Sequence, residues 1–365
     1  MQSFAYAVTI GGYTVRSADD TRTEVVALES TAPLDSPVAA CSIHLHAPNS
    51  AAATGLLANA QAAASAAAGM LGVAASAPPP FSLRGRPVRY ADDVTIDLTV
   101  DRTTARVFTG EVEAVEIAPG LLVVHGRTAM QRLARTHLNQ VYEQQPLAAI
   151  VRDLAQQAGV AVGTVDAGGA WPYLVVHESS SLLRVLHNLA RREGMALYCD
   201  TRNRLCLRKL APVRARVSVR YGVDVLDLWL RRDDTYPAHV QVNGESPASR
   251  RGAQAWPWLA RDLAPFRGDD GQGHWLLVVA DGAVRTRDAA LRAAGARTTA
   301  ARRHSVAGRL VLLGNPALAP GDGLTIADAP LPALNGNFLM HNVRHRYDKE
   351  HGFLSCVEFC GEGGA

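Results

Sequence analysis

Charged residues are missing from one long stretch of this chain. No Asp, Glu, Lys or Arg occurs between Ala47 and Leu83, and residues 51–77 are mostly Ala with Gly, Ser, Asn and Gln. Alanine favours a helix, but Asn59, Gln61 and Ser65 interrupt the run, which is too weakly apolar for a membrane span. We treat 47–83 as an insertion. A small-residue helix or helix pair, a mobile loop and a membrane-active segment all remain open for it.

The chain also has few aromatic residues, few cysteines and no marked excess of charge. Aromatic residues make up 6% of it, and 37 Lys and Arg face 34 Asp and Glu. A nucleic-acid or membrane-surface protein would need clustered basic charge, so we expect neither function. The five cysteines lack close C-x-x-C pairs, so we expect reduced thiols and no zinc knuckle. The first residues lack a basic segment followed by a long apolar core, so we expect no signal peptide and no membrane anchor.

Strand patterns occupy both ends of the sequence, and helical patterns lie between them. Val94, Ile96 and Leu98 alternate with polar residues, as in a half-buried strand. Apolar residues recur at helical spacing in a helix that we expect to begin with Pro146 as its first residue and to stop at Gly159. They recur again from the capping residue Ser181 to Gly194. A length of 365 residues allows two or three domains. We place them at 1–135, 136–212 and 213–365.

The C-terminal third predicts an antiparallel barrel. Strands at 308–313 and 324–326 are separated by turns that contain Pro316 and Pro320-Gly321. In the strand from Phe338 to Tyr347, the alternation predicts that His341, Val343 and His345 share one face. A return strand would bury the face that carries Phe353, Ser355, Val357 and Phe359. We expect 239–244 to belong to this barrel, 249–273 to be a long surface excursion, and 286–303 to be a helix.

Few side chains suggest chemistry. His44 with His46, and His341 with His345, could each supply two metal ligands, but no third ligand is placed nearby. Ser179-Ser180-Ser181 is better explained as a helix start than as a nucleophile. The adjacent carboxylates Asp92-Asp93, Asp233-Asp234 and Asp269-Asp270 are expected to lie in loops and to point apart, unlike a glycosidase pair. The glycines of 268–273 are followed by no P-loop Lys-Ser/Thr. We therefore predict no catalytic residue, no metal and no cofactor.

The order of turns and strands resembles the C-terminal barrel of contractile-tail hub proteins. These are the phage late control D family, the hub half of the type VI secretion VgrG spike and related injection particles. The resemblance rests on a run of positions near the C-terminal end of the sequence, namely Gly314, Pro316, Leu318, Gly321, Asp322, Asn335, Gly336, Phe338, Val343, His345, Tyr347, Gly352 and Phe353. Residues 107–112, with Gly110, resemble a strand of the family's first barrel. Gly159, Gly194 and Tyr198 fall where its middle domain would place them.

This resemblance implies a mainly β fold in which two tail-tube-like antiparallel barrels flank a small α+β domain. It implies a structural, non-enzymatic hub: a homotrimer that forms a pseudo-sixfold ring and joins the tail tube to a separate spike protein, with other baseplate components as further partners. Such a protein would be made in the cytoplasm and would act in an assembled particle, whether a phage tail, a tailocin or an injection system. Two alternatives remain: a cell-wall hydrolase that uses His44 or His345, and a carbohydrate-binding module that uses Trp256 and Trp258.

Overall fold

The computed structural model describes residues 3–18, 24–34, 38–47, 82–83, 86–118, 120–210, 215–233, 236–244 and 266–361. Apart from its ends, the predicted insertion 47–83 lies outside these residues. Trp256 and Trp258 of the predicted excursion also lie outside them.

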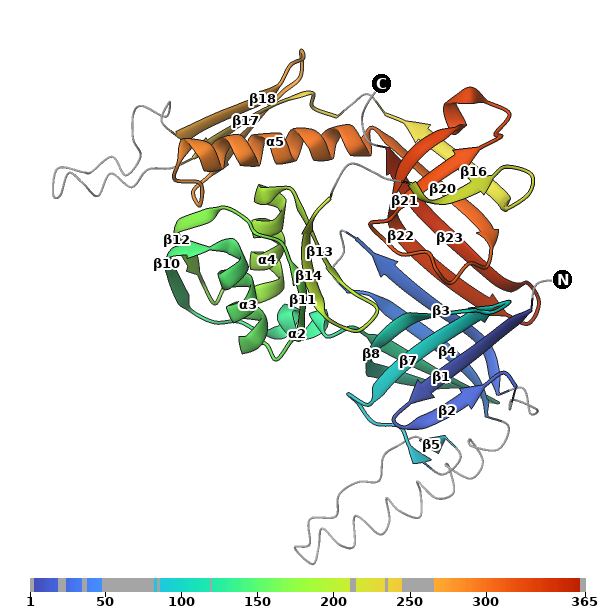
Figure 1. Ribbon diagram of the computed structural model, residues 1–365. Helices are drawn as coiled ribbons and strands as arrows, with labels where there is room; N and C mark the ends of the chain where they lie inside the picture. Colours follow the sequence, from blue (N-terminus) through green and yellow to red (C-terminus); the bar gives the residue numbers. More distant parts are fainter. Residues whose placement is uncertain are drawn as a thin grey trace, which may run out of the picture.

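One large sheet joins the two ends of the chain (Figure 1). Within the described residues it has 13 strands, in the order β16-β20-β23-β22-β3-β4-β9-β8-β7-β1-β2, while β21 pairs with β22 and β15 pairs with β21. From the first half of the chain come β1 (Phe4–Ile10), β2 (Tyr13–Arg16), β3 (Val25–Pro33), β4 (Ala40–Ala47), β7 (Asp93–Val100), β8 (Thr103–Ala118) and β9 (Gly120–Arg127). From the second half come β15 (Ala215–Arg220), β16 (Val225–Arg232), β20 (Val306–Leu313), β21 (Gly323–Ala327), β22 (Gly336–Asp348) and β23 (Gly352–Gly361).

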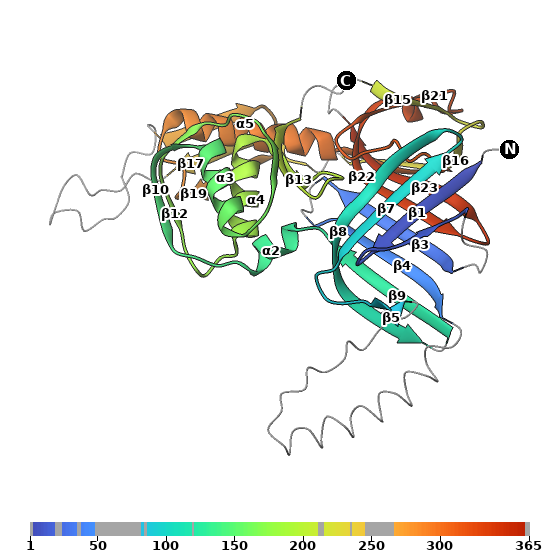
Figure 2. The ribbon, with the colours of Figure 1, turned by 60° about the horizontal axis from the view of Figure 1, so that its bottom comes forward.

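The two groups of strands curl around separate apolar cores but meet along β3 and β22 (Figure 2). These strands pair antiparallel, with Ser30 opposite His345. An aromatic cluster strengthens the join, because the Phe4 ring lies 4.8 Å from the rings of both Tyr347 and Phe353. The predicted mainly β fold with large antiparallel sheets is therefore confirmed, although β15 pairs parallel with β21. The sequence did not indicate that the barrels share a sheet.

A mixed middle module follows the first group of strands. It comprises α2 (Met130–Arg135), β10 (Gln140–Pro146), α3 (Leu147–Gln157), β11 (Val162–Val165), β12 (Ala170–Val176), α4 (Leu182–Glu193), β13 (Met195–Cys199) and β14 (Leu205–Lys209). Ser181 caps α4 as predicted: its hydroxyl accepts a hydrogen bond from the Arg184 amide at 3.4 Å. Pro146 lies one residue before α3, whereas we predicted it as the first helical residue. None of the described helices has the length and apolar character needed to cross a membrane.

The strand at 239–244 is not part of the second barrel, which corrects our prediction. It is β17 (His239–Gly244), the central strand of a separate sheet with β18 (Arg267–Gly271) and β19 (Leu276–Asp281). Val240 and Val242 are fully buried, in one cluster with the small residues of α5 (Arg287–His304). This helix covers one face of the small sheet and also packs against α4 (Figure 1). Strand β18 further shows that the predicted excursion contains regular structure after residue 266.

A bulge in β22 corrects the predicted alternation of that strand. The register with β23 shifts between Met340 and Asn342, and an extra residue in a strand moves the following side chains to the opposite face. Phe338, Met340 and Val343 consequently face the same core. His341 and His345 therefore do not share a face as predicted. A two-stranded pair of β5 (Ser82–Leu83) and β6 (Arg86–Pro87) and a 3-10 turn at Pro332–Leu334 complete the described elements.

Candidate assembly interface

The histidines singled out in the sequence do not form a metal site. His44 and His46 lie on the side of β4 opposite the buried Cys41, Ile43 and Leu45, as predicted. Burial, followed by the charge of His125, lowers the pKa of His44. In the part of the chain that the structure describes, no group of three or more His, Cys, Asp and Glu side chains could hold a metal ion.

His345 is a buried structural residue. Its Nδ1 lies 3.0 Å from the Ser355 hydroxyl, which accepts a hydrogen bond from the Asn315 amide at 3.0 Å. Burial lowers the pKa of His345 to about 4, although a hydrogen bond to the Leu318 backbone opposes this shift. The ring is therefore neutral at pH 7. It fastens the loop after β20 to the β22–β23 hairpin.

The adjacent carboxylates serve turns and strands. Asp92 accepts a hydrogen bond from the Arg89 amide at 2.7 Å, and Asp93 begins β7. Asp269 and Asp270 lie in β18, whereas we expected a loop. Successive strand residues point to opposite faces, so these two carboxylates still cannot act together. Asp233 forms an ion pair with Arg231, and Asp234 lies outside the described residues.

The residues that carried the resemblance do not form one site. Most surround the second barrel, namely Gly314 and Pro316 after β20, Gly321 and Asp322 before β21, Asn335 and Gly336 at the start of β22, His345 and Tyr347 within β22, and Gly352 at the start of β23. Gly110 lies in β8, and Gly159 and Gly194 follow α3 and α4. Gly314 has a clear packing reason, because a Cβ there would lie 1.9 Å from the Phe353 ring. These positions and contacts explain how the residues serve the fold. A role of these residues in assembly stays a prediction.

The side of the shared sheet opposite the cores is polar over β22, β3, β4, β9 and β8. Arg344 of β22 lies 3.4 Å from Glu29 of β3, and Arg127 of β9 lies 2.7 Å from Glu113 of β8. A groove of about 440 Å³ crosses this side between β3, β4, β8 and β9. Exposed ion pairs of this kind add little stability. They keep this side of the sheet hydrated.

The apolar surface that sequence reasoning missed lies at one end of the shared sheet. Strand β16 pairs only with β20 among the described strands, and its other edge carries a single isolated bridge, between Val225 and Tyr221, so most of that edge is open within the described residues. We define the β16 edge patch by its exposed apolar residues, which are Tyr221, Val223, Leu226, Trp229 and Leu313. Leu226 and Trp229 are 58% and 55% exposed, while Leu228 and Leu230 face the core. The signal was present in the sequence, because Leu226 to Leu230 carries more apolar residues than one buried face of a strand requires.

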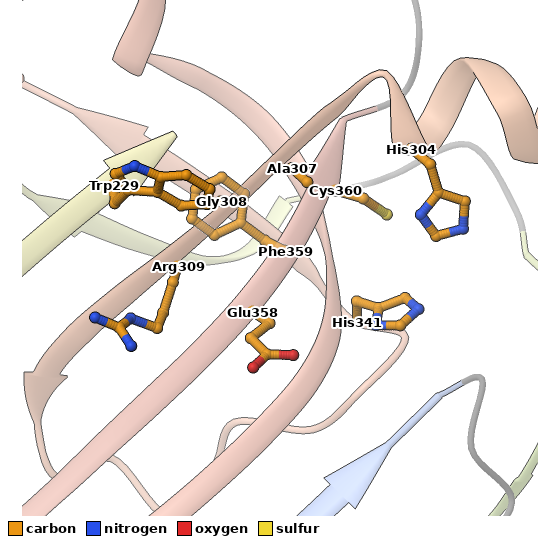
Figure 3. A pocket seen from close by; sticks show the side chains of 9 residues that line it. All are labelled: Trp229, His304, Ala307, Gly308, Arg309, His341, Glu358, Phe359 and Cys360. Atoms are coloured by element: carbon orange, nitrogen blue, oxygen red, sulfur yellow. The ribbon is translucent and has the colours of Figure 1, made fainter. Parts of the chain in front are cut away.

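A hollow of about 530 Å³ lies beside this patch (Figure 3). It is lined by Trp229, His304, Ala307, Gly308, Arg309, His341, Glu358, Phe359 and Cys360. The His304 and His341 rings meet edge to face at 5.6 Å, and Glu358 accepts a hydrogen bond from the Asn342 amide group at 3.3 Å. Arg309 lies 3.6 Å from Asp227 of β16. The hollow thus combines an aromatic face, charged groups and an open strand edge, which are features of a protein contact surface.

Comparisons with known proteins agree with this architecture. The family model described as phage tail baseplate hub (GPD) matches residues 87–351. No curated protein matches the chain. The 43 kDa tail protein of prophage MuSo2 from Shewanella oneidensis is 14% identical and has a TM-score of 0.70, and the alignment covers 99% of both chains.

Two further solved structures share the fold. A tail protein from Neisseria meningitidis MC58 is 10% identical, with a TM-score of 0.67 over 99% of this chain and 97% of that one. An Escherichia coli component of the type VI secretion system is 12% identical, with a TM-score of 0.56 over 96% of this chain and 76% of that one. At these identities the solved structures establish the fold, and the family model extends over most of the chain. The chain belongs to the phage tail baseplate hub (GPD) family.

Proposed function

We propose that this protein is the structural hub of a contractile tail, in which three copies close into a ring between the tail tube and a separate spike protein. The proposed domains 1–135 and 213–365 would each contribute one barrel, so three chains would present six. Other baseplate components would bind outside the ring, and the hub would act in the assembled particle. We further propose that it has no enzymatic activity.

The β16 edge patch is the observation that carries this proposal. An open strand edge with exposed apolar side chains is a template for unwanted pairing unless another chain covers it. In a closed ring, each copy uses the same two unlike surfaces, so every open edge is covered and none is left over.

The solution mass of the full chain tests the ring. We expect analytical ultracentrifugation, with the protein alone or mixed with its spike, to give a hub mass three times the 38.8 kDa of one chain. Two charges introduced together by Leu226→Asp and Trp229→Asp should leave a folded monomer, because a buried interface does not tolerate unpaired charge.

Leu331→Asp is the matched control, since Leu331 is also exposed but lies far along the chain from β16. This variant should remain a trimer. A wild-type protein that stays monomeric both alone and with the spike would disprove the ring.

A further inference from the structure

Arginines gather where the middle module meets the small sheet. The last turn of α4 carries Arg191 and Arg192, α5 carries Arg292 and Arg297, and Arg285 follows β19. Helices α4 and α5 pack against each other here (Figure 1). This junction therefore concentrates positive charge between two parts of the fold.

Two of these arginines already have carboxylate partners. Arg192 donates to both oxygens of Asp281, over 2.7 and 2.8 Å, and Arg292 lies 3.3 Å from Glu193. Asp281 also accepts a hydrogen bond from the Ala283 amide, so both of its oxygens are in use. These two carboxylates therefore have little capacity left for the other arginines.

Arg191, Arg285 and Arg297 have no ion-pair partner among the described residues. The Nε–H groups of Arg285 and Arg297 are buried and make no hydrogen bond within that part of the chain. The same is true of Nε1–H in Trp171, which is only 3% exposed and has the Arg192 guanidinium 5.8 Å above its ring. Buried donors without acceptors are uncommon and costly in folded proteins.

The excess of arginines over available carboxylates is clearest around Arg297. Burial, and then the charge of Arg191, lowers the pKa of Arg297, and Arg192 acts in the same direction. Asp281 opposes this shift, but it is already bound to Arg192 on both oxygens. An added anion would supply both the missing charge and the missing acceptor.

We propose that the junction of α4, β19 and α5 is an oxyanion site, in which Arg297 and Arg191 bind a phosphate or carboxylate group. Arg192, fixed by Asp281, adds a third positive charge. Arg285 is stacked 4.9 Å above the Tyr173 ring of the middle module. Guanidinium groups suit this role because their planar donors match the oxygens of both anions. A bound anion would fasten α5 to the middle module. This inference does not depend on the trimer.

Calorimetric titration of the full chain tests the site with two probes. One is inorganic phosphate, and the other is a hexaglutamate peptide, which represents an acidic protein segment. Sodium chloride at equal ionic strength serves as the blank, since general screening acts on all surface charges alike. Binding of phosphate identifies a free-ion site, and binding of the peptide alone identifies an acidic protein segment as the ligand.

Arg297→Gln should weaken the binding of whichever probe binds to the wild type at least tenfold. Arg184→Gln is the control: it removes an exposed arginine from helix α4, which also carries Arg191, and should change the affinity less than twofold. Without any probe, Arg297→Gln should melt no lower than the wild type, because it removes a half-buried charge that has no ion-pair partner among the described residues.

The proposal fails if neither probe binds more than chloride does. It also fails if Arg297→Gln binds as well as the wild type. A melting temperature of Arg297→Gln well below that of the wild type in chloride would also contradict it, because Arg297 would then already be satisfied within the protein.

Discussion

Single side chains in this protein mainly hold loops and strands together. His345 is an example, because its ring sits among Ser355, the Leu318 backbone and the loop after β20. The same residue was a candidate metal ligand in the sequence. Its burial and its hydrogen bonds, which depend on a loop that is distant in sequence, could not be derived from strand alternation alone.

We predict that His345 makes the fold sensitive to acid. The pKa of its ring is about 4 in the folded protein and 6.5 in a solvated reference. Below pH 6.5 the unfolded chain binds the proton first, so the stability that this residue gives above pH 6.5 is lost as the pH falls towards 4. The shift corresponds to about 3 kcal/mol of unfolding free energy.

Urea unfolding at pH 7 and pH 4.5 measures this effect. The difference in unfolding free energy between the two pH values should be clearly smaller for His345→Gln than for the wild type. His46→Gln, on the exposed side of β4, should keep the wild-type difference. Equal differences in all three proteins would show that His345 does not titrate on unfolding.

At the scale of elements, local signals predicted helices well and strand partners poorly. Helix α4 begins at the predicted cap and ends at Gly194, because capping depends on residues within one turn. The placement of 239–244 was wrong, because its alternation is equally compatible with the large sheet and with the small one. The bulge in β22 was also missed, since the bulge belongs to the register with β23 and leaves no local sequence signal.

Removal of the α4 cap should weaken the middle module. Ser181→Ala leaves the Arg184 amide without its acceptor, so we expect a loss of about 1 kcal/mol in unfolding free energy. Thermal unfolding followed by circular dichroism would measure it. Ser180→Ala, one residue before the cap, should change stability by less than half as much, and an equal loss in both variants would rule out the cap as the cause.

At the scale of the whole molecule, the shared sheet couples the two ends of the chain. The mainly β class and the mixed middle were predictable, because strand and helix periods differ along the sequence. The join between β3 and β22 was not, because pairing between distant strands depends on the three-dimensional arrangement of both barrels. Nor was the arginine junction, which combines residues of α4, β19 and α5.

We predict that a cavity in the apolar core of the first group of strands also destabilises the second group of strands. Leu28 of β3 is almost fully buried, and Leu28→Ala should cost about 2–5 kcal/mol. Because β3 pairs with β22, amide hydrogen exchange should become faster in β22 and β23 as well as in β1 and β7. Leu154→Ala, an equally buried site in the middle module, should accelerate exchange mainly there. Unchanged exchange in β22 and β23 of Leu28→Ala would mean that the barrels open independently.

The pairing of Ser30 with His345 also has a consequence during synthesis on the ribosome. While the chain is being translated, β3 emerges long before β22 is synthesised. The edge of β3 that pairs with β22 in the folded protein therefore has no partner during that time. Contacts between residues so far apart in sequence form slowly and leave early intermediates prone to aggregation. We expect nascent chains stalled before residue 336 to require chaperones. Chains in which the β22–β23 hairpin has emerged from the ribosome should no longer require them.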